Sequence, residues 1–264
     1  MKYKLGIIGL GNMGGAILSG IENDFDGKIL VSTLDPPKIN KNNIDILYDN
    51  KYLAQNCEYI LIAVKPKDAP LILKEIQPFI NNKNILISIM AGIKISTLLK
   101  YLPNIGSVAR VMPNLGAKIG ESCSGIAFYN ASNTVQKFVI DLFKRIGQVV
   151  VLEEEKMDAV TAVSGSGIAY VYYFINSLIK SGEKIGLTRE ESRQLALQTV
   201  LGGVKMVIEH PDHNIEDMIN AVCSKGGTTI EAINVFKERD FEKLIESAVS
   251  AAYKKSILLS KDDA

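Results

Sequence analysis

Histidine and cysteine are scarce in this chain, which contains two histidines and three cysteines among 264 residues. Cys57, Cys123 and Cys223 are widely separated, so they match neither a disulfide framework nor the paired spacing of a zinc site. His210 and His213 lie together without a third metal ligand, and we interpret them as part of a solvated turn. We therefore expect no metal site, no Ser–His–Asp triad and no histidine that donates a proton during hydride transfer.

Charge of one sign and long apolar runs are also lacking. The net charge is +1 and no lysine or arginine run exceeds two residues, so no nucleic-acid partner is expected. The longest apolar stretch, residues 168–175, is far shorter than the roughly 20 residues of a membrane helix. A charged-then-apolar leader is not evident before the first predicted strand. Together with the scattered cysteines, these features predict a cytoplasmic protein with no membrane partner.

The most informative motif lies near the N-terminus. An apolar run at 4–8 is followed by Gly9, Leu10, Gly11, Asn12, Met13 and Gly14, and then by a helix-like run at 16–21. This is G-x-G-x-x-G between a strand and a helix. The three glycines allow a tight turn, close approach of backbone to phosphate, and packing of helix on strand. The helix N-terminus favours the phosphate charge, so the motif predicts a bound dinucleotide.

The first half of the chain alternates between strand and helix patterns. Further strands are predicted at 28–32, 59–64, 85–89, 107–111 and 149–152, with helices beginning at Pro70 and, capped by Thr134, near residue 135. The strand at 59–64 is fully apolar, and that at 85–89 is also interpreted as buried, as in a parallel sheet that is covered on both faces. We therefore predict an α/β fold with an N-terminal Rossmann-type, doubly wound sheet.

The second half reads as helix only. Predicted helices include 168–179, one opened by the capping box Thr188–Glu191, one at 215–222 capped by Asn214, one opened by Thr228 and Thr229, and a last one capped by Asp240. A chain of this length favours two domains. We place an NADP-binding Rossmann domain at 1–152 and an all-helical substrate-binding and dimerisation domain at 153–264.

The helix predicted at 168–179 is apolar on nearly all sides. A helix of this kind is normally buried all round, and few other helices are available in this half to cover it. A second copy of the same region can supply the cover, so we expect a homodimer or larger assembly. A central position in a monomeric bundle is the alternative.

The end of the second predicted strand bears on the choice of cofactor. An NAD site usually places an acid there to hold the ribose hydroxyls. Here the strand ends at Ser32 and Thr33, whose hydroxyls can bond a 2′-phosphate, and Lys38 follows nearby. These residues favour NADP, used as NADPH. Asp35 lies two residues beyond Thr33 and could hold the ribose hydroxyls instead, so NAD stays a second candidate cofactor.

Other turns complete the predicted site. Ala63, Val64, Lys65 and Pro66 end one buried strand, and Ala91 and Gly92 follow the next; ligands of open α/β sheets lie at such carboxyl ends. In the helical half, the stretches 164–167 and 224–229 are small-residue loops that lead into helices. Their free N–H groups and hydroxyls suit a carboxylate. The second loop consists of Ser224, Lys225, Gly226, Gly227, Thr228 and Thr229.

These motifs resemble the pyrroline-5-carboxylate reductase family over essentially the whole chain. The resemblance is carried by the sequence segments 7–14, 63–66, 91–92, 110–114, 163–170 and 224–229. It implies NADPH-dependent reduction of 1-pyrroline-5-carboxylate to L-proline, the last step of proline biosynthesis. It also implies dimerisation through interlocked C-terminal helices, with assembly into a decamer.

The resemblance assigns roles to individual positions. The substrate carboxylate is held at the loop that matches Gly226, Gly227, Thr228 and Thr229, and the hydroxyl near the imine matches Thr229. The family's cofactor contacts fall, in this chain, at Leu10, Asn12, Met13, Thr33, Asn50, Ala63, Val64, Lys65, Pro66, Ala91 and Gly92.

The chain departs from the family pattern at three places. Ile168 and Lys225 stand where the family usually has proline, and Asn220-Ala221 is not its usual pair. Lys225 lies inside the predicted substrate loop, so a related cyclic imine is an alternative substrate. A 3-hydroxyacid dehydrogenase is another alternative, but it needs a catalytic lysine on the first long helix of the second domain. No lysine precedes Lys180 there. A cofactor-binding regulator without turnover is a third alternative.

Overall fold

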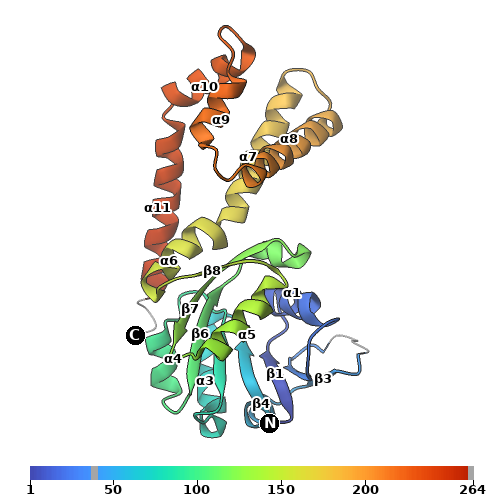
Figure 1. Cartoon of the computed structure of the whole chain (residues 1–264), viewed down its shortest axis with the longest axis vertical. Coiled ribbons are helices and arrows are strands. Elements are labelled where there is room, and N and C mark those ends of the chain that lie inside the picture. The colour runs from blue at the N-terminus through green and yellow to red at the C-terminus, as the bar shows by residue number, and fades with distance from the viewer. Residues whose placement is uncertain (37–40, 261–264) are drawn as a thin grey trace. The chain divides into compact units, whose positions relative to one another are not determined.

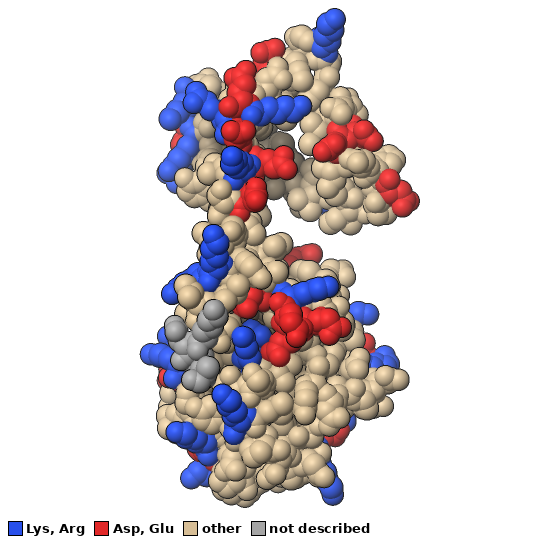
Figure 2. All heavy atoms as spheres, turned by 90° about the vertical axis from the view of Figure 1, so that its left-hand side faces the viewer, with Lys and Arg blue, Asp and Glu red and all other residues tan. Residues whose placement is uncertain are grey.

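The computed structural model describes residues 1–36 and 41–260. These form two compact units, one made of residues 1–168 with the last part of the chain from Ala251, and the other of Ala169–Ser250. The units thus divide at residue 168, whereas the sequence boundary was placed at 152. The functional division at 152 stays a prediction. On the face drawn in Figure 2, basic and acidic side chains are mixed over both units.

The first unit is built on one eight-stranded sheet with the order β3-β2-β1-β4-β5-β6-β7-β8 (Figure 1). All neighbouring strands are parallel except β6 and β7. The strands are β1 (Tyr3–Ile8), β2 (Ile29–Ser32), β3 (Ile44–Leu47), β4 (Cys57–Ile62), β5 (Ile85–Ser88), β6 (Ser107–Met112), β7 (Ser122–Tyr129) and β8 (Gly147–Val151). The order reverses between β1 and β4, and this switch point is where open α/β sheets bind their ligands.

Helices cover both faces of the sheet. One apolar core includes residues of α2 (Asn50–Asn56), α3 (Ala69–Ile76) and α4 (Ile95–Tyr101). The other includes residues of α1 (Asn12–Ile21) and α5 (Asn133–Lys144). This confirms the predicted doubly wound Rossmann-type fold, because each face has its own core beneath its own helices.

Some predicted boundaries and caps were wrong in detail. The N-cap of α5 is Ser132, whose hydroxyl accepts from the N–H of Val135, whereas Thr134 lies inside the helix. The helix predicted from Pro70 begins at Ala69, after a 3₁₀ turn at Pro66–Asp68. The short elements β3, α2 and α4 and the antiparallel strand β7 had not been predicted.

The second half is helical, as predicted. It contains α6 (Met157–Val160), α7 (Gly167–Lys184), α8 (Arg189–Glu209), α9 (Ile215–Val222), α10 (Thr228–Glu238) and α11 (Phe241–Leu259). The capping box at Thr188 and Glu191 is present, and Asn214 caps α9. Asp240 directly precedes α11, and its backbone carbonyl accepts from the N–H of Leu244. Among the described residues, no helix is long and apolar enough to span a bilayer.

Helix α7 carries a broad apolar surface that the single chain leaves uncovered. None of its residues is buried, and Tyr172 and Tyr173 are 63% and 77% exposed. Leu195 and Val204 of α8 are 56% and 52% exposed. Contiguous apolar surface of this kind marks an interface in soluble proteins. The chain therefore presents the face that a second copy was expected to cover.

Candidate active site

The glycine-rich turn connects β1 to α1 at the switch point of the sheet. Gly9 has a φ of +94°, a conformation that side-chain-bearing residues rarely adopt. Its N–H donates to the Ser32 carbonyl at 2.8 Å, and the Ala63 N–H donates to the Ile8 carbonyl at 2.8 Å. The turn is thus bonded to the ends of the strands on both sides, β2 and β4.

Gly11 and Gly14 have separate structural roles. A Cβ atom on Gly14 would lie 2.2 Å from the Gly9 carbonyl oxygen, so only glycine lets α1 approach the turn this closely. A Cβ atom on Gly11 would have no neighbour within 4 Å, and this space lies directly in front of the α1 N-terminus. The helix has no side-chain cap and no acidic residue in its first turn. The arrangement leaves first-turn N–H groups able to bind a phosphate.

A cavity of 410 Å³ opens beside this turn, at the carboxyl ends of β1, β2 and β4. It collects many of the predicted cofactor residues. Those that line it are Gly9, Leu10, Gly11, Ser32, Thr33, Asn50, Ala63, Val64 and Lys65. Leu34, Asp35, Tyr48, Lys67, Asp68 and Ile72 line it too. Of these, Tyr48, Lys67, Asp68 and Ile72 were not singled out from the sequence, because no motif distinguishes them from ordinary surface residues.

The Ser32 hydroxyl is already hydrogen-bonded within the protein. It is buried, and it donates to Asn50 Oδ1 at 2.7 Å, while Asn50 Nδ2 donates to Glu75 Oε2 at 2.8 Å. A hydroxyl has one proton to donate, so Ser32 cannot also donate to a 2′-phosphate while this bond is kept. Ser32 instead orients the Asn50 side chain in the wall of the cavity.

Charged residues of both signs surround the end of β2. Asp35 lines the cavity with Lys65 and Lys67, and Thr33 is nearly buried at its wall. Lys38, which was also expected near this end, lies outside the described residues. The contact of Thr33 with a 2′-phosphate stays a prediction, and two lysines line the same cavity.

The remaining cofactor candidates lie outside the lining of this cavity. Asn12 lines a neighbouring hollow, Met13 packs on a core, and Pro66 starts a 3₁₀ turn. Ala91 and Gly92 follow β5.

Gly92 has a φ of +80°, and a Cβ atom there would lie 3.4 Å from the backbone of Leu259. The last turn of α11 is tied down close by, because Asp158 Oδ1 accepts from Ser256 Oγ at 2.6 Å and from Ser260 Oγ at 3.1 Å. The turn after β5 is thus bounded by the C-terminal helix.

The stretch 164–167 differs from the loop that was predicted. Residues Thr161–Gly165 form a π-helical turn that runs on into α7, and the Ser166 N–H donates to the Thr161 carbonyl at 2.8 Å. Its N–H groups are therefore not free for a carboxylate as a loop's would be. The Ser164 hydroxyl donates to the Cys123 carbonyl at 2.8 Å and accepts from Asn114 Nδ2 at 3.0 Å. A π-turn inside a helix is frequent at functional sites.

The second predicted substrate loop, 224–229, has the expected form. Gly226 has a φ of +73°, and the Gly227 N–H donates to the Ser224 carbonyl at 3.0 Å. Gly227 then serves as the N-cap of α10 without a side-chain cap. Thr228 and Thr229 are exposed in the first turn of that helix, as is Lys225 before it. The loop offers hydroxyls and backbone N–H groups at a helix N-terminus, which suits a carboxylate.

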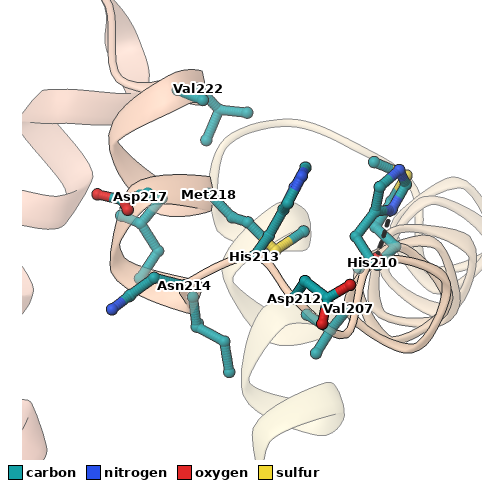
Figure 3. A pocket seen from close by; sticks show the side chains of 13 residues that line it. Val207, His210, Asp212, His213, Asn214, Asp217, Met218 and Val222 are labelled. Carbon is teal, nitrogen blue, oxygen red and sulfur yellow. Dashed lines mark hydrogen bonds between the residues drawn. The ribbon is translucent and has the colours of Figure 1, made fainter.

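The two histidines lie beside a different, apolar cavity of 740 Å³ formed by α8, α9 and the turn between them (Figure 3). His210 Nδ1 is 2.9 Å from the Met206 carbonyl oxygen on its own helix, and the centroids of the His210 and His213 rings lie 5.1 Å apart. In the described part of the chain, no group of three or more His, Cys, Asp or Glu side chains is placed to hold a metal.

Arg110 and Cys57 are two buried ionisable groups of the first unit. Arg110 is 2% exposed and its Nη1 donates to Glu154 Oε1 at 3.0 Å; the same oxygen accepts from the Ile95 N–H at 2.7 Å. The ion pair thereby fastens the N-terminus of α4 to β6. Burial raises the pKa of the Cys57 thiol to about 12, so this cysteine is an unreactive core residue.

Comparison with known proteins decides the family. Residues 154–259 match the family described as "Pyrroline-5-carboxylate reductase dimerisation". Residues 4–92 match a second family, described as "NADP oxidoreductase coenzyme F420-dependent". Pyrroline-5-carboxylate reductase of Staphylococcus haemolyticus is 33% identical, with 98% of this chain and 99% of the relative covered. The chain belongs to the pyrroline-5-carboxylate reductase family. A Staphylococcus aureus enzyme of the same name is 34% identical over 97% of this chain and 98% of its own length.

Solved structures of the reductase family have the same fold. The crystal structure of Plasmodium falciparum pyrroline carboxylate reductase with NADP bound is 34% identical, covers 99% of this chain and all of its own, and gives a TM-score of 0.89. The Coxiella burnetii reductase is 27% identical with the same coverage and a TM-score of 0.90. The family carries a dimerisation domain in the region where this chain exposes the apolar face of α7.

Proposed function

We infer that this reductase-family chain reduces 1-pyrroline-5-carboxylate to L-proline with NADPH. The observation that carries the inference is the open glycine-rich turn at the sheet's switch point, in a chain that matches named reductases over nearly its full length. When bound, NADPH would supply a hydride from its nicotinamide to the imine carbon. The protein contributes binding and orientation of the two reactants.

The residues around the cavity of 410 Å³ fit the adenosine half of NADP. The first-turn N–H groups of α1 and the open space over Gly11 accommodate the pyrophosphate. Thr33, Lys65 and Lys67 provide a hydroxyl donor and positive charge for the 2′-phosphate, whereas Ser32 and Asn50 shape the cavity wall. The turns ending in Pro66 and Gly92 follow the neighbouring strands β4 and β5 and are assigned to the nicotinamide half.

The loop 224–229 is the proposed binding site for the substrate carboxylate. Its support is the uncapped N-terminus of α10, with exposed hydroxyls at Thr228 and Thr229. Thr229 is the proposed catalytic residue: its hydroxyl bonds the ring nitrogen and relays the proton that the nitrogen gains as the carbon receives hydride. No covalent intermediate with the protein is involved.

The alternatives receive less support. A 3-hydroxyacid dehydrogenase needs a lysine early in the first long helix, and α7 carries none before Lys180. Solved structures named as oxidoreductases or dehydrogenases that share the layout are only 11–16% identical, which shows the fold alone. Lys225 is exposed in the substrate loop and, in the described residues, forms no ion pair within 4.0 Å. It favours a related cyclic imine only if its ammonium group reaches a second acidic group on that substrate.

Assembly of dimers into a decamer is proposed from the family resemblance. The dimer itself is supported by the dimerisation domain and the uncovered apolar face of α7. A cytoplasmic location remains our expectation from the scattered free cysteines.

A substrate panel tests the function. Purified protein is assayed for NADPH oxidation with 1-pyrroline-5-carboxylate and with a six-membered cyclic imine carboxylate. It is also assayed for NADP⁺ reduction with 3-hydroxyacids. We expect the highest kcat/KM with 1-pyrroline-5-carboxylate. Lys225→Pro should leave that value intact or improved, and Lys225→Met should match wild type. A strong rise in KM for both variants would instead assign the ammonium group to the substrate, and turnover of hydroxyacids alone would contradict the inference.

A further inference from the structure

A second hollow adjoins the glycine-rich turn on the other side of the α1 N-terminus. Its volume is 570 Å³, and its lining residues are Leu10, Gly11, Asn12, Gly15, Ala16, Ser19 and Lys118. Leu10 and Gly11 also line the cavity of 410 Å³, so the two hollows meet at the turn. All the lining residues except Lys118 come from the motif and α1, and Lys118 is the one charged residue among them.

The segment that carries Lys118 is firmly placed against the sheet. It is a 3₁₀ turn, Leu115–Ile119, that follows β6 and is capped by Asn114, whose Oδ1 accepts from the Gly116 N–H at 2.9 Å. The Glu121 N–H donates to the Gly116 carbonyl at 2.9 Å. Ala117, the residue before Lys118, is buried in the core beneath α1 and α5. The backbone therefore fixes the origin of the Lys118 side chain beside α1.

The ammonium group of Lys118 is directed to the glycine-rich turn. Its Nζ lies 3.5 Å from Asn12 Oδ1, at the first residue of α1. Across residues 1–36 and 41–260, it has no carboxylate partner within 4.0 Å, and the first turn of α1 has no acidic residue. A positive charge beside a helix N-terminus is not stabilised by the helix dipole, which places its own positive end there. An anion lying between them would be attracted to both.

We propose that Lys118 binds the pyrophosphate of NADP(H), supplying a side-chain charge where the family motif supplies backbone N–H groups. The proposal deepens the proposed function and rests on its cofactor site. It assigns Lys118 to the pyrophosphate rather than the 2′-phosphate, because Thr33, Lys65 and Lys67 line the other cavity, and Lys118 does not. Sequence reasoning missed Lys118 because it lies about 100 residues beyond the motif and belongs to no motif of its own.

The test measures binding, independently of turnover. Dissociation constants for NADPH and NADH are determined from the fluorescence of their reduced nicotinamide. That of adenosine 2′-monophosphate, which has the 2′-phosphate but no pyrophosphate, is determined by its competition with NADPH. Lys118→Gln should raise the dissociation constants for NADPH and NADH by the same factor. We expect roughly three- to tenfold, the range for one partly exposed charge contact. Adenosine 2′-monophosphate should bind unchanged. Lys118→Arg should restore most of the affinity, and Lys100→Gln, at the exposed end of α4, is the matched control.

Ionic strength gives a second measurement. The affinity of the wild type for NADPH should fall more steeply with added salt than that of Lys118→Gln, since the variant has lost one charge contact. Equal dissociation constants for wild type and Lys118→Gln would overturn the proposal. Weaker binding of NADPH and adenosine 2′-monophosphate, with NADH binding unchanged, would also overturn it, because it would assign Lys118 to the 2′-phosphate. Failure of the wild type to bind NADPH at all would overturn the proposed cofactor site itself, which separates the two conclusions.

Discussion

The glycines of the β1–α1 turn show how neighbouring residues of one type carry different functions. Gly14 is required by packing, because a Cβ atom would meet the Gly9 carbonyl oxygen at 2.2 Å. Gly11 has ordinary negative φ, and a Cβ atom would meet no neighbour within 4 Å. Packing alone therefore does not explain Gly11, and a ligand that approaches the backbone does.

Paired alanine substitutions test this difference. Gly11→Ala should leave the melting temperature close to that of wild type and weaken NADPH binding at least tenfold, because its methyl group occupies the pyrophosphate space. Gly14→Ala should lower the melting temperature by several degrees, because α1 must move away from β1. Thermal unfolding and NADPH titration measure both. A Gly11→Ala protein with wild-type affinity would show that no ligand approaches this turn.

Thr229 is the residue on which the proposed chemistry depends. Thr229→Ala should lower kcat by on the order of tenfold to a thousandfold, the range for loss of one transition-state hydrogen bond or proton relay. The dissociation constant for NADPH should stay near wild type. Thr229→Ser keeps the hydroxyl and should recover most of the rate. An unchanged kcat in the alanine variant would remove Thr229 from the mechanism.

Cofactor preference is expected to depend on Thr33 rather than Ser32. Thr33→Val keeps the shape and removes the hydroxyl, so kcat/KM should fall several-fold more with NADPH than with NADH. Ser32→Ala releases Asn50 and should affect both cofactors to a similar extent, because the Ser32 hydroxyl bonds Asn50 and not solvent. Equal losses with both cofactors in Thr33→Val would contradict the assignment.

At the scale of secondary structure, the sequence predicted what depends on regular patterns. The buried strands β4, β5 and β6 and the capping box of α8 were found, because burial on two faces and capping leave clear local signals. Strand β7 was missed, because its mixture of serines, glycine and apolar residues has no period of two.

The π-helical turn at Thr161–Gly165 was read as a loop for a similar reason. Small residues such as Ser164 and Gly165 are typical of loops, and only tertiary bonds to Asn114 and Cys123 distinguish this turn. The Ser32–Asn50 bond could not be foreseen either, because its partners are 18 residues apart on different elements.

The N-terminus of α8 gives a stability prediction for a whole element. The Glu191 N–H donates to Thr188 Oγ1 at 3.3 Å, and the Thr188 N–H and hydroxyl donate to Glu191 Oε2, both at 2.8 Å. Thr188→Ala removes the hydroxyl and should lower the free energy of unfolding by about 1 kcal/mol, the usual cost of losing a threonine cap. Urea unfolding followed by circular dichroism measures it, and a change below a few tenths of a kcal/mol would contradict it.

The same cap should depend on pH in a defined direction. Hydrogen bonds from the Thr188 N–H and, secondarily, its hydroxyl hold the pKa of Glu191 below its ordinary value. The folded state therefore favours the ionised carboxylate, and this contribution is present above the unfolded pKa and lost as pH falls through the lowered folded pKa. Wild type should lose more stability than Glu191→Gln between pH 5 and pH 3. Parallel losses would show that the cap does not titrate.

At the scale of the whole molecule, the uncovered face of α7 requires a partner. Tyr173 is 77% exposed in the single chain, on a helix whose family domain serves dimerisation. Tyr173→Glu should shift the protein to smaller species in analytical ultracentrifugation, because a buried charge in an apolar interface is costly. Leu71→Glu, at a 72% exposed position of α3, is the control and should keep the wild-type mass. Monomeric wild type with full activity would contradict the assembly.

The conclusion that the whole chain is an imine reductase is tested most directly by counting products. Purified wild-type protein is supplied with NADPH and 1-pyrroline-5-carboxylate, and L-proline is quantified by chromatography while absorbance at 340 nm follows the cofactor. We predict one L-proline for each NADPH oxidised, over many turnovers, with the rate falling by tenfold or more in Thr229→Ala. Wild-type protein that binds NADPH but forms no proline would contradict this function.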